Sequence, residues 1–456
     1  MRLWILILLA SAGCAQIYLP PAPKLMWDTW VFRKGDEFHM FYLQNDPGRI
    51  WESIGRAVSK DLIHWKTLPA IETQGAAGTW DSGPTLTGIT IESGGKYLMF
   101  YANEPKSGQS IGLMESPDLV NWKKYDRNPL LVSRPPYYGG RDWRDMFVRR
   151  DAKTGVWHGY ICARTANKDA AVAHLTSTNL LDWTYLPPLF SDSSLNDMEV
   201  PEPFEIGGRH YLVFSSVRSR MKETSGRKDA SGTFYLVGDS ADGPYRFPAE
   251  PLLLGSGRGR FDVYVGRTLR YGRELLLYSQ TVGGPVMWAT PKVIRQNKDG
   301  SLWLGYWKEL DKLKARPLSQ VARASVKDGS LLLQKDAGDF MLECEIARGG
   351  APKAGFVWRE ANSKSSGMLL DRASGVAEVL ENGKVIDDIL IPGFGKRSQR
   401  IRVLVRAHRA ELYVNDRWLF NWRMRSMPRS GALSLTASGG EARVSRLKIS
   451  QLEPLP

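Results

Sequence analysis

Cysteine is scarce in this chain, which has only Cys14, Cys162 and Cys344 among 456 residues. Cys162 and Cys344 fall within separate apolar segments, so we expect buried free thiols and no disulfide. The sequence has no Cys/His spacing typical of a metal site, and we expect neither a metal nor a cofactor. The net charge is +14, but lysine and arginine form no concentrated run, which argues against a nucleic-acid partner.

The apolar run that opens the chain, residues 3–10, is too short to span a bilayer. Residues 1–15 combine a basic start, this run and a small-residue end, which is typical of a secretory signal peptide. We therefore expect export to the periplasm or the extracellular space. Two outcomes fit the end of the segment: cleavage after Ala15, or lipidation of Cys14, which would tether the protein to a membrane.

A short unit recurs along the chain, in which a turn with glycine and charge precedes an apolar, aromatic strand. Its five copies are residues 33–42, 94–101, 154–160, 207–214 and 271–278. Each copy is typical of a β-hairpin turn that enters a buried strand.

A second unit follows four of these copies, and its aromatic ends lie 57, 61 and 64 residues apart. The copies are residues 59–65, 116–122, 177–183 and 240–247. The spacing suits a four-stranded sheet with its turns. Strand patterns repeated five times at this length predict an all-β fold with a five-bladed β-propeller over residues 24–310.

Acidic residues lie just upstream of each of the five hairpin turns. In chain order they are Asp28, Asp81, Asp145, Glu199 with Glu202, and Asp262. The innermost strand of each blade lines the central funnel of a propeller, so we expect a ring of carboxylates there. Glycoside hydrolysis needs such a set, because one carboxyl protonates the leaving oxygen while another attacks the anomeric carbon or activates water.

Several ordered segments resemble glycoside hydrolase family 32, the invertase, levanase and inulinase-like β-fructosidases. The segments FHMFYLQNDP (38–47) and IGRAVSKDLIHW (54–65) are similar to that family's HLFYQYNP and WGHAxSxDLxHW. Later segments resemble its WSGS, Arg-Asp-Pro, Glu-Cys-Pro-Asp and Asp-Phe-Tyr-Ala motifs, and they are residues 80–83, 143–148, 198–204 and 261–264.

The resemblance implies a role for each matching residue. Asp28 would be the nucleophile, Asp145 would stabilise the transition state through sugar hydroxyls, and Glu199 would be the acid/base. Glu202 is the alternative acid. The residues expected to bind substrate are Trp27, Gln44, Trp80, Asp81, Arg144, Glu202 and Asp262.

The chain departs from the family pattern around the nucleophile. Asp28 lies in Met-Trp-Asp-Thr-Trp, where the family usually has WMNDPNG. Arg56 stands in place of the family's histidine, and Val200 in place of its cysteine. Because these changes would reshape a sugar subsite, a substrate other than plain sucrose, inulin or levan fits the sequence.

Neither repeated unit occurs after residues 309–317, a charged segment that ends in proline and is predicted to be a linker. Residues 318–453 show alternating strands, for example 340–346 and 399–405, which predict an antiparallel β-sandwich. Family 32 enzymes carry such a sandwich after the propeller. We expect it to act as a packing partner for the propeller.

The sequence therefore predicts an exported hydrolase that cleaves terminal fructosyl linkages of an oligo- or polysaccharide by a retaining two-carboxylate mechanism. One alternative is an inverting arabinosidase or xylosidase similar to glycoside hydrolase family 43. A second alternative is a glycan-binding propeller without turnover, which would be favoured if the acidic residues did not converge.

Overall fold

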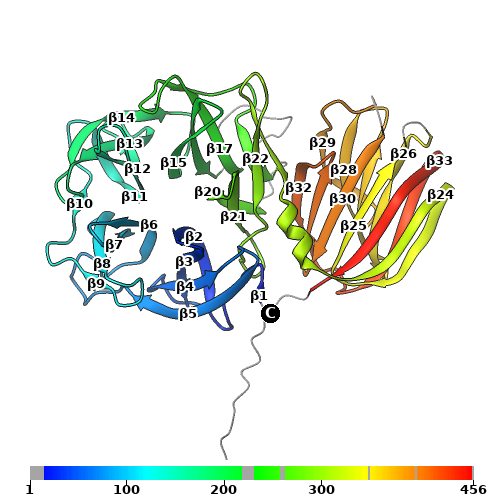
Figure 1. Cartoon of the computed structure of the whole chain (residues 1–456), viewed down its shortest axis with the longest axis horizontal. Coiled ribbons are helices and arrows are strands. Elements are labelled where there is room, and N and C mark those ends of the chain that lie inside the picture. Colours follow the sequence, from blue (N-terminus) through cyan, green and yellow to red (C-terminus); the bar gives the residue numbers. More distant parts are fainter. Residues whose placement is uncertain (1–14, 218–230, 257–261, 348–349, 396–397, 454–456) are drawn as a thin grey trace, which may run out of the picture.

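The computed structural model describes residues 15–217, 231–256, 262–347, 350–395 and 398–453. Cys14 and the rest of the expected signal segment before Ala15 lie outside the described residues. The chain forms a ring of sheets and, beside it, a two-layered body of strands (Figure 1). Strands form nearly all of the regular structure, so the predicted all-β class is confirmed.

Five antiparallel sheets make up the ring. The first runs β1 (Ala15–Gln16), β5 (His64–Glu72), β4 (Ser53–Ser59), β3 (Glu37–Asn45) and β2 (Leu25–Lys34). The second runs β10 (Leu131–Val132), β8 (Ser110–Ser116), β7 (Lys96–Asn103) and β6 (Thr85–Ser93), with β9 (Lys123–Lys124) beside β8. The third runs β11 (Tyr138–Arg150), β12 (Trp157–Thr165), β13 (Ala170–Ser177) and β14 (Thr184–Asp192).

The last two sheets complete the ring. The fourth runs β15 (Glu199–Ile206), β16 (Arg209–Ser216), β17 (Ser231–Gly238) and β18 (Tyr245–Arg246), with β19 (Leu252–Ser256) also on β17. The fifth begins with β20 (Val263–Tyr271), β21 (Glu274–Thr281), β22 (Lys292–Gln296) and β23 (Leu302–Tyr306).

One edge strand of each sheet lies nearest the centre of the ring, and these strands are β2, β6, β11, β15 and β20 (Figure 1). β2 contacts β6, β6 contacts β11, β11 contacts β15, β15 contacts β20, and β20 contacts β2 again. This closed circuit of neighbours confirms the predicted five-bladed propeller. The segment after β1 bridges the first and fifth blades, because Ile17 N–H donates to the Ile63 carbonyl and Trp288 N–H donates to the Tyr18 carbonyl.

The repeated Ser-x-Asp-Leu unit builds the same turn in successive blades. The Ser59 hydroxyl accepts the Leu62 N–H at 2.9 Å, and the Asp61 carboxylate accepts the next two N–H groups along the chain. The Trp65 indole N–H then donates to the Leu62 carbonyl. The copies at residues 116–122 and 177–183 repeat these bonds, with the side-chain amide oxygen of Asn179 in place of a carboxylate in the third blade. Short polar side chains that bond their own backbone explain why the sequence pattern fixes the turn.

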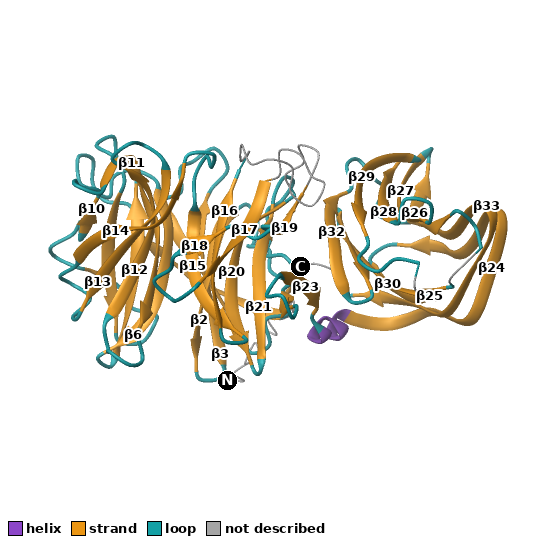
Figure 2. Cartoon of the chain, turned by 90° about the horizontal axis from the view of Figure 1, so that it is seen from above, coloured by secondary structure: helices purple, strands orange, loops and turns teal. Residues whose placement is uncertain are grey.

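The second body begins with the 3-10 helix η1 (Lys308–Leu313), and Figure 2 shows this helix between the two bodies. Its strands are β24 (Lys314–Ala337), β25 (Phe340–Ile346), β26 (Lys353–Ala361), β27 (Lys364–Asp371), β28 (Val376–Glu381), β29 (Lys384–Leu390), β30 (Gln399–Arg406), β31 (Arg409–Val414), β32 (Arg417–Arg423) and β33 (Gly431–Leu452). One end of the long strand β33 pairs with β25 and its other end pairs with β26. The large buried side chains Phe340, Trp358 and Trp422 lie between the layers. This confirms the predicted antiparallel sandwich.

Buried polar contacts join the sandwich to the fifth blade. Lys292 Nζ lies 3.3 Å from Glu411 Oε2, and both side chains are buried. The Arg409 guanidinium donates to the carbonyls of Val282, at 2.7 Å, and Asp262, at 3.2 Å. Such groups cost free energy unless they are paired, so these contacts favour one fixed arrangement of the two bodies.

Cys162 and Cys344 are free and buried, as predicted. Among the described residues, helices of the length and apolarity that a membrane crossing requires do not occur.

Candidate active site

An irregularity in the innermost strand of every blade builds the site. The pairing register of each inner hairpin shifts, after Trp27, Leu86, Arg144, Glu199 and Tyr264, and the third blade has a further shift between Tyr138 and Trp143. Extra residues in these bulges adopt positive φ at Asp28, Asp145, Val200 and Val265. A β-bulge bends its strand and re-aims side chains, and aspartate tolerates positive φ better than most residues.

Asp28 receives hydrogen bonds from two neighbouring blades. The Thr87 hydroxyl on β6 donates to its Oδ2. The Gln280 side-chain amide on β21 lies 3.5 Å from its Oδ1. The second and fifth blades therefore orient a carboxylate that the first blade supplies.

The charge state of Asp28 depends on the other acids. Burial, and then the carboxylates of Asp145 and Glu199, raise the pKa of Asp28 to about 8. The Thr87 hydrogen bond and the positive charge of Arg144 lower the pKa of Asp28, but by less. The carboxylates of Asp145 and Glu199 therefore lie close enough to Asp28 to disfavour its negative charge.

Asp145 is buried at the start of the third blade's bulge. The Val200 N–H donates to its Oδ2 at 3.2 Å, and Arg144 Nε lies 3.6 Å from the same oxygen. Burial raises the pKa of Asp145 to about 6, against the lowering effect of Arg144 and with a further rise from Glu199. Asp145 is thus a buried acid that a cation partly neutralises.

Glu199 is held from both sides. Arg144 Nη2 lies 2.9 Å from Oε1, and the Tyr264 hydroxyl donates to Oε2. Arg144 itself is fixed by the Asp142 carboxylate at 2.8 Å. Its neighbouring carboxylates keep the pKa of Arg144 well above its usual value despite burial, so its charge is permanent.

Three of the predicted catalytic residues therefore converge, and two further predicted residues border them. Asp28, Asp145 and Glu199 come from the first, third and fourth blades, and Arg144 links the last two. Trp27 is partly buried and packs against the small apolar cluster of Val200, Tyr264 and Val265. This contact joins Trp27 to residues of the fourth and fifth blades, among them Tyr264, whose phenol donates to Glu199.

The remaining predicted residues of the first two blades make contacts within their own blades. The Gln44 amide donates to Ser53 at 3.3 Å. Asp81 is buried and lies 2.5 Å from Lys124 Nζ; this hydrogen bond, with one from Thr79, outweighs burial and lowers the Asp81 pKa. The Trp80 ring packs on Tyr101 at 5.5 Å and lies over Gly112, where a Cβ would collide with it.

Glu202 contacts the neighbouring blade, and Asp262 lies near an arginine of the sandwich. Glu202 is buried and accepts from Arg267 Nε at 3.3 Å and from the Thr268 N–H at 3.0 Å. These bonds tie the fourth blade to the fifth. Asp262 is also buried, and its Oδ1 lies 4.0 Å from Arg409 Nη1 of the sandwich.

Thr87 and Tyr264 contact the carboxylates but are not in the predicted set, which consists largely of acidic and aromatic side chains. A positional signal for both exists. Thr87 precedes Gly94 by seven residues, as Asp28 precedes Gly35. Tyr264 precedes Gly272 by eight residues, as Glu199 precedes Gly207.

Comparison with known proteins gives one family and several relatives. Residues 23–269 match the family model described as "Glycosyl hydrolases family 32 N-terminal domain". A levanase of Bacillus sp. (strain L7) is 25% identical over 470 residues, covering 91% of this chain and 49% of the levanase. An acid beta-fructofuranosidase of Phaseolus vulgaris is 36% identical over 130 residues, covering 26% of this chain and 19% of that protein. The chain thus spans about half the length of the levanase and matches a smaller share of the plant enzyme.

Two solved structures have the same fold over nearly the whole chain. Fructan 1-exohydrolase IIa from Cichorium intybus has a TM-score of 0.76 at 15% identity, covering 97% of each chain. Exo-inulinase from Aspergillus awamori has a TM-score of 0.76 at 16% identity, covering 98% of this chain and 99% of the inulinase. At this identity the likeness concerns the fold alone.

Proposed function

This chain belongs to glycosyl hydrolase family 32, and from that membership we propose that it is a β-fructosidase, which cleaves terminal fructosyl linkages with retention of configuration. The observation that carries the proposal is the convergence of Asp28, Asp145 and Glu199 around Arg144. Buried carboxyls that are distant in sequence and raise one another's pKa are typical of a catalytic centre. The names of the relatives, a levanase and a beta-fructofuranosidase, support the fructosyl class of substrate.

We assign the roles as follows. The Asp28 carboxylate attacks the anomeric carbon, the bond to the leaving oxygen breaks, and Glu199 gives its proton to that oxygen. In the second half of the reaction Glu199 takes a proton from water, and the water oxygen displaces Asp28 from the anomeric carbon. Asp145 accepts hydrogen bonds from sugar hydroxyls and stabilises the positive charge that develops on the ring.

The protonation state of the cluster limits the pH range of this chemistry. With pKa values raised to about 8 for Asp28 and about 6 for Asp145, the substrate-free cluster retains a proton at neutral pH. Turnover needs a negative charge on Asp28, which the Thr87 hydrogen bond and the positive charge of Arg144 favour. We therefore expect activity to fall as the pH decreases below about 8, where Asp28 takes up a proton and can no longer attack.

The test is sugar release from sucrose, levan, inulin and arabinose- or xylose-based glycans. We expect fructose from the fructosyl substrates, and loss of that release in Glu199→Gln and Asp28→Asn. Matched controls are Glu205→Gln on the same strand as Glu199, and Asp36→Asn in the turn after β2, since both side chains are exposed. Proton NMR of the first fructose released should show the β-anomer.

Other outcomes would point elsewhere. Activity on pentosides alone, with inversion, would move the protein to the arabinosidase or xylosidase alternative. Sugar binding without turnover in the wild type would make it a glycan-binding protein. Fructose release that survives Asp28→Asn would remove Asp28 from the nucleophile role.

We also propose that the protein is exported, on the composition of residues 1–15. Cell fractionation and the mass of the mature N-terminus test this proposal. A mass that begins after Ala15 indicates simple cleavage, whereas a lipid-modified Cys14 indicates a membrane tether. An unprocessed chain in the cytoplasm would contradict it.

A further inference from the structure

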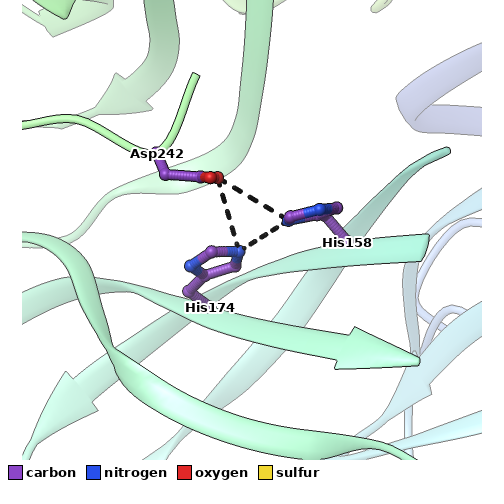
Figure 3. A group of neighbouring side chains, drawn as sticks. All are labelled: His158, His174 and Asp242. Atoms are coloured by element: carbon purple, nitrogen blue, oxygen red, sulfur yellow. Dashed lines mark hydrogen bonds and ion pairs between the residues drawn. The ribbon is translucent and has the colours of Figure 1, made fainter. Parts of the chain in front are cut away.

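Two histidines and an aspartate meet at the boundary between the third and fourth blades (Figure 3). His158 lies on β12, His174 lies on β13, and Asp242 lies in the turn between β17 and β18. His158 Nδ1 is 2.9 Å from His174 Nε2. Asp242 Oδ1 is 3.7 Å from the former nitrogen and 4.0 Å from the latter.

We propose that His158, His174 and Asp242 bind a divalent transition-metal cation of the zinc type. A tetrahedral metal with bonds of about 2.0–2.2 Å separates its ligand atoms by roughly 3.3–3.5 Å, and the three separations here lie on both sides of that value. Imidazole nitrogen with carboxylate oxygen is a donor set that suits zinc and its neighbours in the first transition row. Three protein ligands leave the fourth position to water.

The surroundings favour imidazoles that bind as neutral ligands. The His174 ring stacks on Tyr160 with its centroid 5.2 Å away and the planes 10° apart, and it stacks on His158 as well. His174 is buried and His158 is partly buried, and burial disfavours a charged imidazolium ring. Neutral imidazoles present lone pairs to a metal without first losing a proton.

The charges around the cluster are mixed. The carboxylates of Asp242 and Asp151 favour positive charge at His158, and the guanidinium of Arg149 disfavours it. Arg149 is held by the Tyr160 hydroxyl at 3.3 Å. The Asp242 side chain is 59% exposed, so this ligand can move toward a bound cation at little cost.

A cation at this place would connect two blades. Both histidines belong to the third blade, whose inner strand carries Asp145, and Asp242 belongs to the fourth blade, whose inner strand carries Glu199. The metal would therefore resist separation of the blades that supply two of the three carboxyls. Its contribution would be to stability, because the ligands lie on strands other than the ones that bear the acids.

The experiment uses zinc and the full chain after dialysis against a chelator. We expect one saturable equivalent of Zn²⁺ by isothermal titration calorimetry and a rise in the melting temperature on zinc addition. Asp242→Asn, His158→Gln and His174→Gln should each weaken zinc binding about tenfold or more. Asp242→Asn is the most informative variant because an exposed turn residue should leave the metal-free melting temperature unchanged.

Two control variants should keep the affinity of the wild type. His64→Gln removes a histidine whose Nδ1 lies 2.8 Å from Asp61 Oδ2, and Glu199→Gln alters the acidic cluster. The proposal is overturned if the wild type shows no saturable zinc binding. It is equally overturned if the three ligand variants bind zinc as the wild type does, or if Glu199→Gln alone loses it.

Discussion

Arg144 Nη2 on the third blade lies 2.9 Å from Glu199 Oε1 on the fourth, so one guanidinium joins the blades that supply two of the three carboxyls. Its Nε is also 3.6 Å from Asp145 Oδ2, and Asp142 holds it at 2.8 Å. A planar fork can satisfy several oxygens at once, whereas an ammonium group is a single point charge. The position of Glu199 therefore depends on the shape of the Arg144 side chain as well as on its charge.

Arg144→Lys should lower kcat by about a hundredfold, because lysine keeps the charge but cannot hold Glu199 and Asp142 together. The measurement is steady-state kinetics on the best fructosyl substrate, with the melting temperature as a check on folding. Arg164→Lys is the matched control. Arg164 Nε lies 2.5 Å from the same Asp142, and its Nη2 donates to the Asn196 carbonyl, whereas the Arg144 guanidinium binds Glu199. Equal kinetics for the two variants would contradict the role given to Arg144.

Thr87→Val should move the acid limb of the kcat/KM profile to higher pH. The Thr87 hydrogen bond lowers the pKa of Asp28, so its removal raises that pKa, and a higher pH is then needed to ionise the nucleophile. Loss of a hydrogen bond to a charged group predicts a fall in kcat/KM of about tenfold below the limb. Thr87→Ser should restore the wild-type profile, and a profile that is unchanged in Thr87→Val would refute the prediction.

Tyr264→Phe should lower kcat by about tenfold to a hundredfold with little change in KM. The variant removes the O–H group that donates to Glu199 but keeps the buried ring, so the apolar contact with Trp27 remains. Tyr245→Phe is the control, because that buried phenol donates to the Ala241 carbonyl instead. A fall in activity shared by both variants would indicate a general packing effect.

Much of the propeller could be predicted because its signals are local. The Ser-x-Asp-Leu turn bonds its own backbone, and each glycine turn precedes a strand that alternates or is wholly apolar. Such patterns repeat in the sequence as they do in space. The convergence of Asp28, Asp145 and Glu199 then follows from the ring, since equivalent positions of all blades face one centre.

The composition of the ring could not be read from residue type alone. A carboxylate is predicted for every blade, but in the second and fifth blades the side chains that contact the acids are Thr87 and Tyr264. The predicted Asp81 of the second blade pairs with Lys124 instead. The bulges decide this, because one extra residue in a strand changes which side chains face the centre. The burial of Glu202 against Arg267 depends on a partner 65 residues away, which no local pattern specifies.

Asp28→Asn should raise the melting temperature by a few degrees near pH 8 while it abolishes turnover. The folded-state pKa of Asp28 is raised to about 8, so between about pH 4 and pH 8 the folded protein binds more protons than the unfolded chain. Its stability therefore falls as the pH rises through that range. Asparagine cannot ionise, so the advantage of the variant should grow from pH 5 to pH 8 in thermal melts.

Asp81→Asn should do the opposite, which makes it the matched comparison. Its folded-state pKa is lowered by Lys124 and Thr79, so the ionised carboxylate stabilises the fold above its unfolded pKa, and this contribution is lost as the pH falls through the folded value. The variant should therefore melt below the wild type at pH 7 and approach it in acid. If both variants changed stability in the same direction at pH 8, the opposite electrostatic environments assigned to the two aspartates would be wrong.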